Sequence, residues 1–191
     1  GLTVPQSRIL AKKFTGLSLP DIEKLMSSKI HEERLIALLI LVDQFSEGDR
    51  VKQKVITHFY LANTRHINNW DLVDLSAPKI LGAATFGGLT SKSILTRLAG
   101  SKNLWERRIA VLATFYFIQH NQFAETLRLA KILLYDQHNL IHKAVGWMLR
   151  EVGKRDQGVE EKFLKKYYKN MPRTMLRYAI ERFPEKLRQK Y

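Results

Sequence analysis

The feature that most constrains the fold is a helical pattern that recurs five times around a small residue. The five segments span residues 30–42, 70–81, 105–117, 141–152 and 173–183, and they align on Ala37, Ala77, Ala110, Gly146 and Ala179. The steps between these small residues are 40, 33, 36 and 33 residues, so each step has room for two helices and two turns. A small residue also lets a partner helix approach closely. The spacing therefore predicts an α-solenoid of HEAT-like or armadillo-like repeats.

Signals for other architectures are weak. The sequence has no sustained alternation of apolar and polar residues and no Asn-Gly or Asp-Gly hairpin turn, so an all-α fold is expected. Helix stop signals, among them Gly158, Pro172 and Pro184, separate about twelve predicted helices. No low-complexity tract or linker interrupts the chain, which predicts one helical-repeat domain over residues 1–191.

In four of the five segments, a charged residue stands three positions before the small residue. In order, these positions hold Arg34, Asp74, Arg107, Lys143 and Leu176. If equivalent helices line the concave face of the solenoid, these side chains point into one groove. The groove is then expected to be basic, with Asp74 as its acidic exception.

The charge balance of the whole chain indicates an anionic partner. The sequence holds 32 Lys and Arg against 18 Asp and Glu, with a net charge of +14 and a pI near 10.0. Nucleic acid, an anionic membrane surface or another acidic polymer would attract such a protein. The basic residues are spread through all the repeats, which suits a long polyanion better than a membrane-binding helix. The longest apolar run, Leu35 to Val42, is far shorter than the roughly 20 residues that span a bilayer, so a soluble intracellular protein is expected.

Several catalytic and metal-binding motifs are missing. The chain has no Cys, which excludes disulfides, Cys-based zinc sites and a Cys nucleophile. The HEERL segment lacks a second His four residues after His31, and His138 and His142 have the spacing of metal ligands without further ligands nearby. The GAATFGGLT segment lacks the Gly-Lys-Ser/Thr of a phosphate-binding loop, and no GxSxG elbow is present. We therefore expect neither a metal nor an organic cofactor.

The segment NNWDLVD, residues 68–74, is the leading candidate site. Trp70 and Asp74 are four residues apart, so they share one face of a helix. The alternative is a core tryptophan beside a solvated carboxylate near a helix start. Trp147 has the same core alternative. Arg107 and Arg108 lie on different sides of a helix, so one could pair with an acid while the other reaches a phosphate.

The segments as a whole resemble a known family. HEERLIALLILVDQF, NNWDLVDLSAPKILG, LWERRIAVLATFYFI, HKAVGWMLREVGK, MPRTMLRYAIERFPEKLR and the opening GLTVPQSRILAKKF occur in the order and spacing of that family. The sequence is similar to the HEAT-like-repeat DNA alkylation repair proteins, the AlkD-type alkylpurine DNA glycosylases. The resemblance covers nearly the whole chain. Members usually begin with a further helix before GLTVP, and we expect that helix to be absent or trimmed in this protein.

The resemblance implies roles for particular residues. Asp74 matches the catalytic carboxylate, and Trp70 and Trp147 match the two tryptophans of the groove. Arg108 matches the arginine that grips the DNA backbone, and Arg150 matches a further basic contact. From their place in the repeats and in the basic clusters, four more residues are expected to contact DNA: Lys143, Arg107, Arg173 and Arg177.

The resemblance also implies an activity. The family excises cationic purines alkylated at N3 or N7, such as 3-methyladenine and 7-methylguanine, from double-stranded DNA without base flipping. No Schiff-base lysine stands out, which predicts a monofunctional glycosylase of base excision repair that leaves an abasic site. A monomer that works in the cytoplasm, associated with the nucleoid in a prokaryote, is expected.

Two other functions fit the same repeats. A non-catalytic HEAT-repeat protein could bind damaged or branched DNA through the basic groove. A protein-binding scaffold could use the concave face for an acidic peptide.

Overall fold

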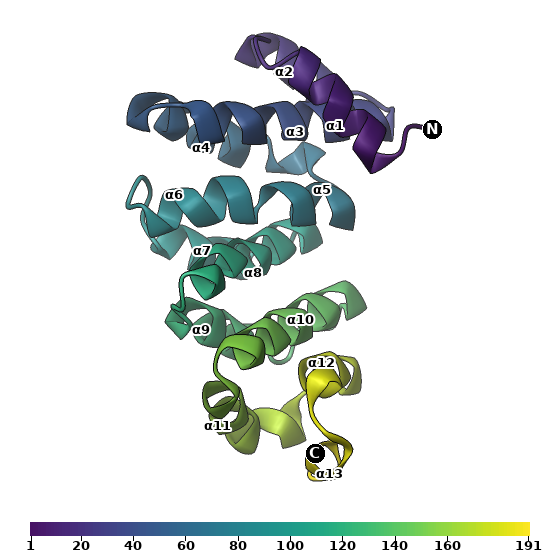
Figure 1. Ribbon diagram of the computed structural model, residues 1–191, viewed down its shortest axis with the longest axis vertical. Coiled ribbons are helices and arrows are strands. Elements are labelled where there is room, and N and C mark those ends of the chain that lie inside the picture. The colour runs from purple at the N-terminus through teal and green to yellow at the C-terminus, as the bar shows by residue number, and fades with distance from the viewer. The chain divides into compact units, whose positions relative to one another are not determined.

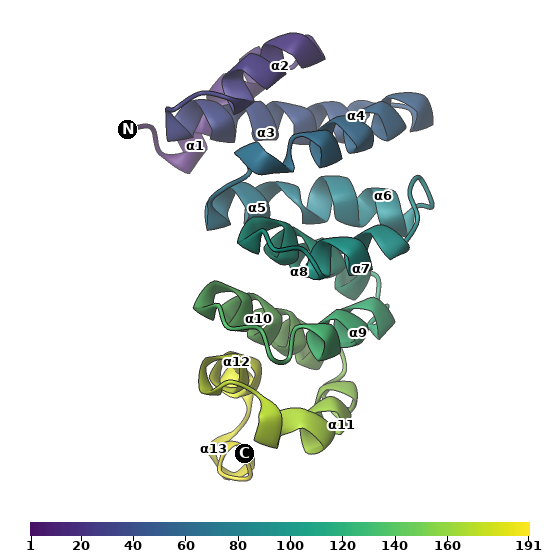
Figure 2. The same ribbon diagram turned by 180° about the vertical axis from the view of Figure 1, so that it is seen from behind.

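The computed structural model describes residues 1–191 and is built from helices alone (Figures 1 and 2). The sequence prediction of an all-α, helical-repeat fold is confirmed. The chain divides into two compact units, residues 1–92 and residues 93–191, which are described in turn. A single repeat domain over the whole chain stays a prediction.

The first unit is organised around α3, which packs against α1, α2, α4 and α5. Its elements are α1 (Val4–Lys13), α2 (Leu19–Met26), α3 (His31–Glu47), α4 (Arg50–Ala62), a 3-10 turn (Thr64–His66), α5 (Trp70–Ser76), a π-helical turn (Pro78–Gly82) and α6 (Ala83–Phe86). Polar side chains cap the starts of α1, α2, α4 and α5, because the first backbone N–H groups of a helix have no partner within it. Thr3 and Gln6 form a capping box on α1, and Asp49 accepts from the backbone N–H of Lys52 on α4.

Pro78 interrupts the helix predicted over residues 70–81 without ending it. Proline has no backbone N–H and normally breaks a helix interior. Here the chain widens to a π turn, in which the N–H of Gly82 donates to the carbonyl of Ala77 at 2.9 Å. The chain therefore continues from α5 through the π turn into α6.

The second unit stacks helix pairs against one another. Its elements are α7 (Ser93–Ala99), α8 (Leu104–Gln119), α9 (Ala124–Ile132), α10 (Asn139–Arg155), α11 (Gln157–Tyr167), a 3-10 turn (Tyr168–Asn170), α12 (Arg173–Ala179), a 3-10 turn (Ile180–Arg182) and α13 (Glu185–Arg188). Helix α10 is central and contacts α8, α9, α11 and α12 (Figure 1). Pro172 and Pro184 precede helices as predicted, whereas Gly158 lies inside the first turn of α11.

The small residues of the five segments lie inside the protein. Ala37, Ala77, Ala110 and Ala179 are fully buried. At Gly146 of α10, an added Cβ would lie only 2.6 Å from the Cβ of Tyr178 and would also clash with the backbone carbonyl of Met175. The close approach of α12 to α10 therefore requires glycine at this position, and the predicted role of Gly146 is confirmed.

Candidate functional site

Trp70 and Asp74 stand one turn apart on α5, as the spacing predicts. Asn69 begins this helix, because its side-chain oxygen accepts from the backbone N–H of Trp70 at 2.7 Å. The Trp70 residue is 55% exposed, so the alternative that it is a core residue is wrong. Its indole surface is available to a ligand, and the partly buried Asp74 follows one turn later.

A buried tyrosine lies close to the Asp74 carboxylate. The hydroxyl of Tyr60 lies 3.0 Å from the Ser76 hydroxyl, and its side chain is fully buried. Burial raises the pKa of Tyr60 well above its ordinary value. The Ser76 hydrogen bond lowers that pKa, and the negative charge of Asp74 raises it. Tyr60 therefore stays protonated.

A second carboxylate on α5 is bound to α3. The Nε2 atom of His31 lies 2.7 Å from Oδ2 of Asp71, and Oδ1 of Asp71 accepts from the N–H of Leu72 at 2.9 Å. Arg34 joins the cluster, because its Nη2 lies 3.4 Å from Nδ1 of His31, while its Nη1 donates to the Ser28 carbonyl at 2.7 Å. This cluster holds the start of the helix that carries Trp70. Sequence reasoning missed it, since His31 and Asp71 are 40 residues apart.

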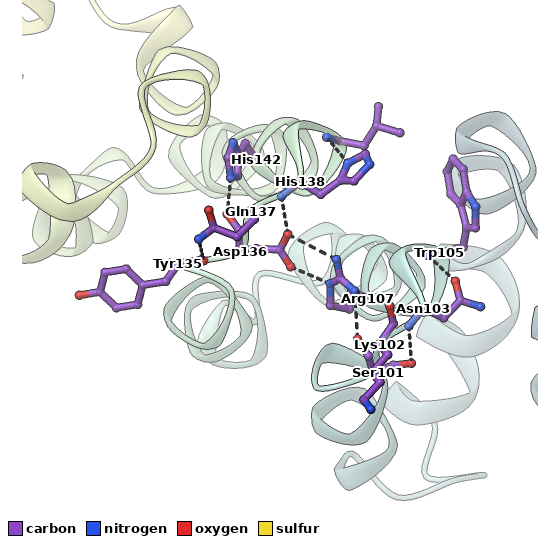
Figure 3. A network of polar contacts seen from close by, with 11 residues as sticks. Ser101, Lys102, Asn103, Trp105, Arg107, Tyr135, Asp136, Gln137, His138 and His142 are labelled. Atoms are coloured by element: carbon purple, nitrogen blue, oxygen red, sulfur yellow. Dashed lines mark hydrogen bonds and ion pairs between the residues drawn. The ribbon is translucent and has the colours of Figure 1, made fainter.

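In the second unit, Arg107 joins two loops (Figure 3). Its Nε donates to Oδ2 of Asp136 at 2.6 Å, and its Nη1 donates to the carbonyls of Ser101 and Lys102 at 3.0 and 3.1 Å. The expectation that one of the paired arginines binds an acid is confirmed for Arg107. Arg34 likewise bonds a Ser carbonyl six residues earlier, so the two repeats use the same contact. A DNA contact by Arg107 stays a prediction.

Arg108 points into the second unit. It is only 5% exposed, and its Nη1 donates to the carbonyl of Leu140 in the first turn of α10 at 2.8 Å. A guanidinium has five N–H donors, so this bond uses part of its capacity. The structure shows Arg108 holding α8 and α10 together, and its grip on a DNA phosphate stays a prediction.

Trp147 is partly buried on α10. Its ring centroid lies 6.1 Å from that of Phe115 with the planes tilted by 39°, and its Nε1 donates to Oε1 of Glu151 at 3.0 Å. These contacts fix the orientation of the indole. Trp147 is thus packed against the protein and also partly exposed to solvent, whereas Trp70 is mainly exposed.

Three of the expected DNA contacts gather in one cleft of about 500 Å³ in the second unit. Lys143 and Arg150 come from α10, Arg177 comes from α12, and Glu181 completes the lining from the following 3-10 turn. Arg150 forms an ion pair with Glu181 through its Nη1. Arg173, also exposed, lines an adjacent depression together with Arg177.

The structure shows no group of three or more His, Cys, Asp or Glu side chains that could hold a metal ion. The two histidines with metal-ligand spacing form hydrogen bonds to the backbone at the start of α10. The Nδ1 of His138 accepts from the N–H of Leu140 at 3.2 Å, and the Nε2 of His142 donates to the carbonyl of Asp136 (Figure 3). These bonds give both side chains a structural role.

The candidate residues thus fall into two groups, one in each unit. The first unit carries Trp70 and Asp74. The second unit carries Trp147, Arg107, Arg108, Lys143, Arg150, Arg173 and Arg177. Their convergence on one ligand stays a prediction.

Comparison with known proteins identifies the family. The sequence profile of the DNA alkylation repair enzymes matches residues 1–183. This chain belongs to that family. The resemblance predicted from the sequence is confirmed, and membership supports an enzymatic role in the repair of alkylated DNA.

Two solved structures have the same fold. A predicted DNA alkylation repair enzyme from Enterococcus faecalis is 18% identical, with a TM-score of 0.76 over 97% of this chain and 88% of its own. The smu.31 protein from Streptococcus mutans UA159 is 19% identical, with a TM-score of 0.64 over 95% of this chain and 93% of its own. At these identities the likeness shows the fold. No curated protein matches the sequence. No helix has both the length and the apolar character needed to cross a membrane.

Proposed function

We propose that this protein is a monofunctional DNA glycosylase that hydrolyses the N-glycosidic bond of cationic N3- or N7-alkylated purines in duplex DNA. The observation that carries the proposal is the pair on α5, an exposed Trp70 one turn from the Asp74 carboxylate, in a chain of the DNA alkylation repair family. The expected lesions are 3-methyladenine and 7-methylguanine.

The charge of the lesion explains why a carboxylate and aromatic rings suffice. An N3- or N7-alkylated purine is a cation, so it takes the bonding electron pair and departs as a neutral base. The sugar develops positive charge at C1′ as that bond breaks. Water then adds its oxygen to C1′ and releases a proton to the solvent. The step needs no redox partner, and no cofactor is proposed.

Asp74 is proposed to stabilise the positive charge that develops on the sugar and to orient the attacking water. A fixed carboxylate is worth most where charge appears only in the transition state. Trp70 and Trp147 would face the cationic nucleotide, each contributing on the order of 0.5–2 kcal/mol of cation–π attraction. The lesion is proposed to stay outside any deep pocket, in contrast to enzymes that flip the base.

The basic residues of the second unit are proposed to hold the phosphate backbone of the duplex. Lys143, Arg150 and Arg177 share one cleft, and Arg173 lies exposed beside it. A cleft with this charge attracts DNA of any sequence, and its affinity should fall steeply as salt rises. Weak salt dependence would instead favour the protein-binding scaffold.

The test is to incubate N-methylated duplex DNA with the protein and to identify the released bases by chromatography. The wild type should release 3-methyladenine or 7-methylguanine, and Asp74→Asn should release far less. Asp43→Asn is the matched control, because Asp43 is a partly buried carboxylate on α3 of the same unit. Tight binding without release of any base by the wild type would support the non-catalytic DNA-binding protein and contradict the glycosylase.

A further inference from the structure

The cleft between α10 and α12 has the composition of an anion site. Its charged lining consists of three cations, Lys143, Arg150 and Arg177, and one carboxylate, Glu181. Both walls are fixed, because Gly146 lets the backbone of α12 pack directly against α10. A cleft of about 500 Å³ with three cations suits an anion with several oxygen atoms.

Arg150 is the innermost of these cations. Its side chain is 18% exposed, and its Nε is buried without a hydrogen-bond partner, 3.7 Å from Oε1 of Glu151. Its outward-facing Nη1 pairs with Oε2 of Glu181. One guanidinium nitrogen of Arg150 is therefore engaged by a carboxylate of the protein.

Glu181 is weakly anchored by comparison. Its side chain is 53% exposed, and it belongs to a 3-10 turn of three residues, Ile180–Arg182. The ion pair with Arg150 leaves the two other cations of the cleft, Lys143 and Arg177, without an ion-pair partner. Because the Glu181 partner is half-exposed, solvent screens its pairing with Arg150, and a competing anion can displace the carboxylate at small cost.

We propose that Glu181 occupies the position at Arg150 that a phosphodiester of the DNA backbone takes in the complex. The cleft would then be a phosphate site that the Glu181 carboxylate fills in the absence of DNA. A carboxylate and a phosphodiester both offer two oxygens to a guanidinium, which makes one a close substitute for the other. The phosphodiester gains more, because it also meets Lys143 and Arg177. DNA binding must first release Glu181, and this weakens binding to every duplex that fails to fill the cleft.

This inference rests on the proposed function only in taking DNA as the ligand. It adds a residue that limits affinity, Glu181, and assigns Arg150 to a position that exchanges one anion for another. Catalysis at Asp74 plays no part in it, so undamaged DNA is a sufficient probe.

The experiment measures the Kd of an undamaged, fluorescently labelled duplex by anisotropy at several salt concentrations. Glu181→Gln should tighten binding by about two- to fivefold, the range expected when a half-exposed ion pair no longer competes. Glu185→Gln is the matched control, because this substitution removes the same charge. Glu185 lies on the adjacent α13, is exposed and pairs with Arg188. That control should change the Kd little.

A double-mutant cycle completes the test. If Glu181 acts through Arg150, the gain from Glu181→Gln should disappear in an Arg150→Gln background. Equal effects of Glu181→Gln and Glu185→Gln would overturn the proposal, since they would reflect net charge alone. A gain that persists without Arg150 would overturn it as well. Glu181 and Glu185 are both exposed, so their replacement leaves the core unchanged.

The two proposals fail in different ways. Base release by the wild type together with an unchanged Kd for Glu181→Gln would remove the phosphate exchange and leave the glycosylase standing. The opposite result is a protein that releases no base, in which Glu181→Gln tightens the duplex Kd and Arg150→Gln abolishes that gain. This result would remove the glycosylase and leave the phosphate exchange standing. Absence of any binding to duplex DNA by all variants would contradict the exchange directly.

Discussion

The Nε2 atom of His31 lies 2.7 Å from Oδ2 of Asp71, which fixes α3 to the first turn of α5. Asp71 stands between the two proposed site residues of that helix, Trp70 and Asp74, so the contact sets where both side chains point. A displacement of about 1 Å in a catalytic group can cost a large factor in rate. His31 and Asp71 are therefore positioning residues in this account.

Replacing Asp71 tests that role. Asp71→Asn should lower the free energy of unfolding by about 1 kcal/mol, the value of a partly exposed charged contact. Single-turnover base release should slow by less than it does for Asp74→Asn. The duplex Kd should stay unchanged, because the phosphate contacts are proposed to lie in the second unit. A rate equal to that of the wild type would show that the contact serves stability alone.

Replacing Trp70 should lower the activity without lowering the stability of the fold. Because it is 55% exposed, Trp70→Ala should leave the melting temperature nearly unchanged. Base release should slow by about 2- to 30-fold, which corresponds to the loss of 0.5–2 kcal/mol of cation–π attraction. Val51→Ala, at an even more exposed apolar residue of the same unit, is the control for both readouts. Unchanged base release would remove Trp70 from the site.

Trp147→Ala should behave differently from Trp70→Ala. The indole packs near Phe115 and donates to Glu151, so its loss should lower the melting temperature as well as the rate. Differential scanning fluorimetry on the two variants measures the contrast. Equal melting temperatures for the two would contradict the packing role that the structure gives to Trp147.

Replacing Arg107 should lower the stability of the fold, whereas replacing Arg173 should weaken DNA binding. Arg107→Ala leaves the Asp136 side chain, only 6% exposed, without its ion-pair partner, and about 3 kcal/mol of stability should be lost. Arg173→Ala, at an exposed position, should leave stability unchanged and weaken DNA binding. The slope of log K against log salt should fall by about 0.9 for one lost phosphate contact. An unchanged slope would remove Arg173 from the interface.

Glu160 makes stability depend on pH. This carboxyl is buried between α10 and α11, where Gly153 leaves room for it: a Cβ there would lie 2.7 Å from the Glu160 Cδ. Burial raises the pKa of Glu160 to about 8, the charge of Glu161 raises it and the charge of Arg150 lowers it. The folded protein thus keeps a proton that the unfolded chain loses near pH 4.5, so stability falls as pH rises from about 4.5 to about 8.

Glu160→Gln should remove this dependence. The variant and the wild type should be equally stable near pH 4.5. The advantage of the variant should then grow by at most ~1.4 kcal/mol per pH unit and level off above pH 8. Urea unfolding across this range measures it. A wild-type stability that rises over the same window would contradict the buried neutral carboxyl.

Much of the fold could be predicted from local pattern. The helices and the small-residue register follow from periodicity, and Gly146 is the clearest case because the partner helix touches the position of its missing side chain. The π turn at Pro78 could not be predicted, since proline normally ends a helix. Tertiary packing keeps that helix continuous.

The site was predictable in its residue types and less so in its contacts. Trp70 and Asp74 share a helix face because of their spacing alone. The partners of His31, Arg107 and Arg150 lie 40, 29 and 31 residues away in the sequence, so no local pattern could reveal them. The burial of Arg108 and its bond to the Leu140 carbonyl on the next long helix were equally invisible to a local pattern.

The most direct test of the central claim is the single-turnover rate of 3-methyladenine or 7-methylguanine release from methylated duplex DNA, measured for the wild type and Asp74→Asn at matched occupancy. We expect the wild type to release the base, with a rate at least about 100-fold lower for Asp74→Asn and a duplex Kd that is equal or tighter. Equal rates for the two proteins, or no release by the wild type, would contradict it.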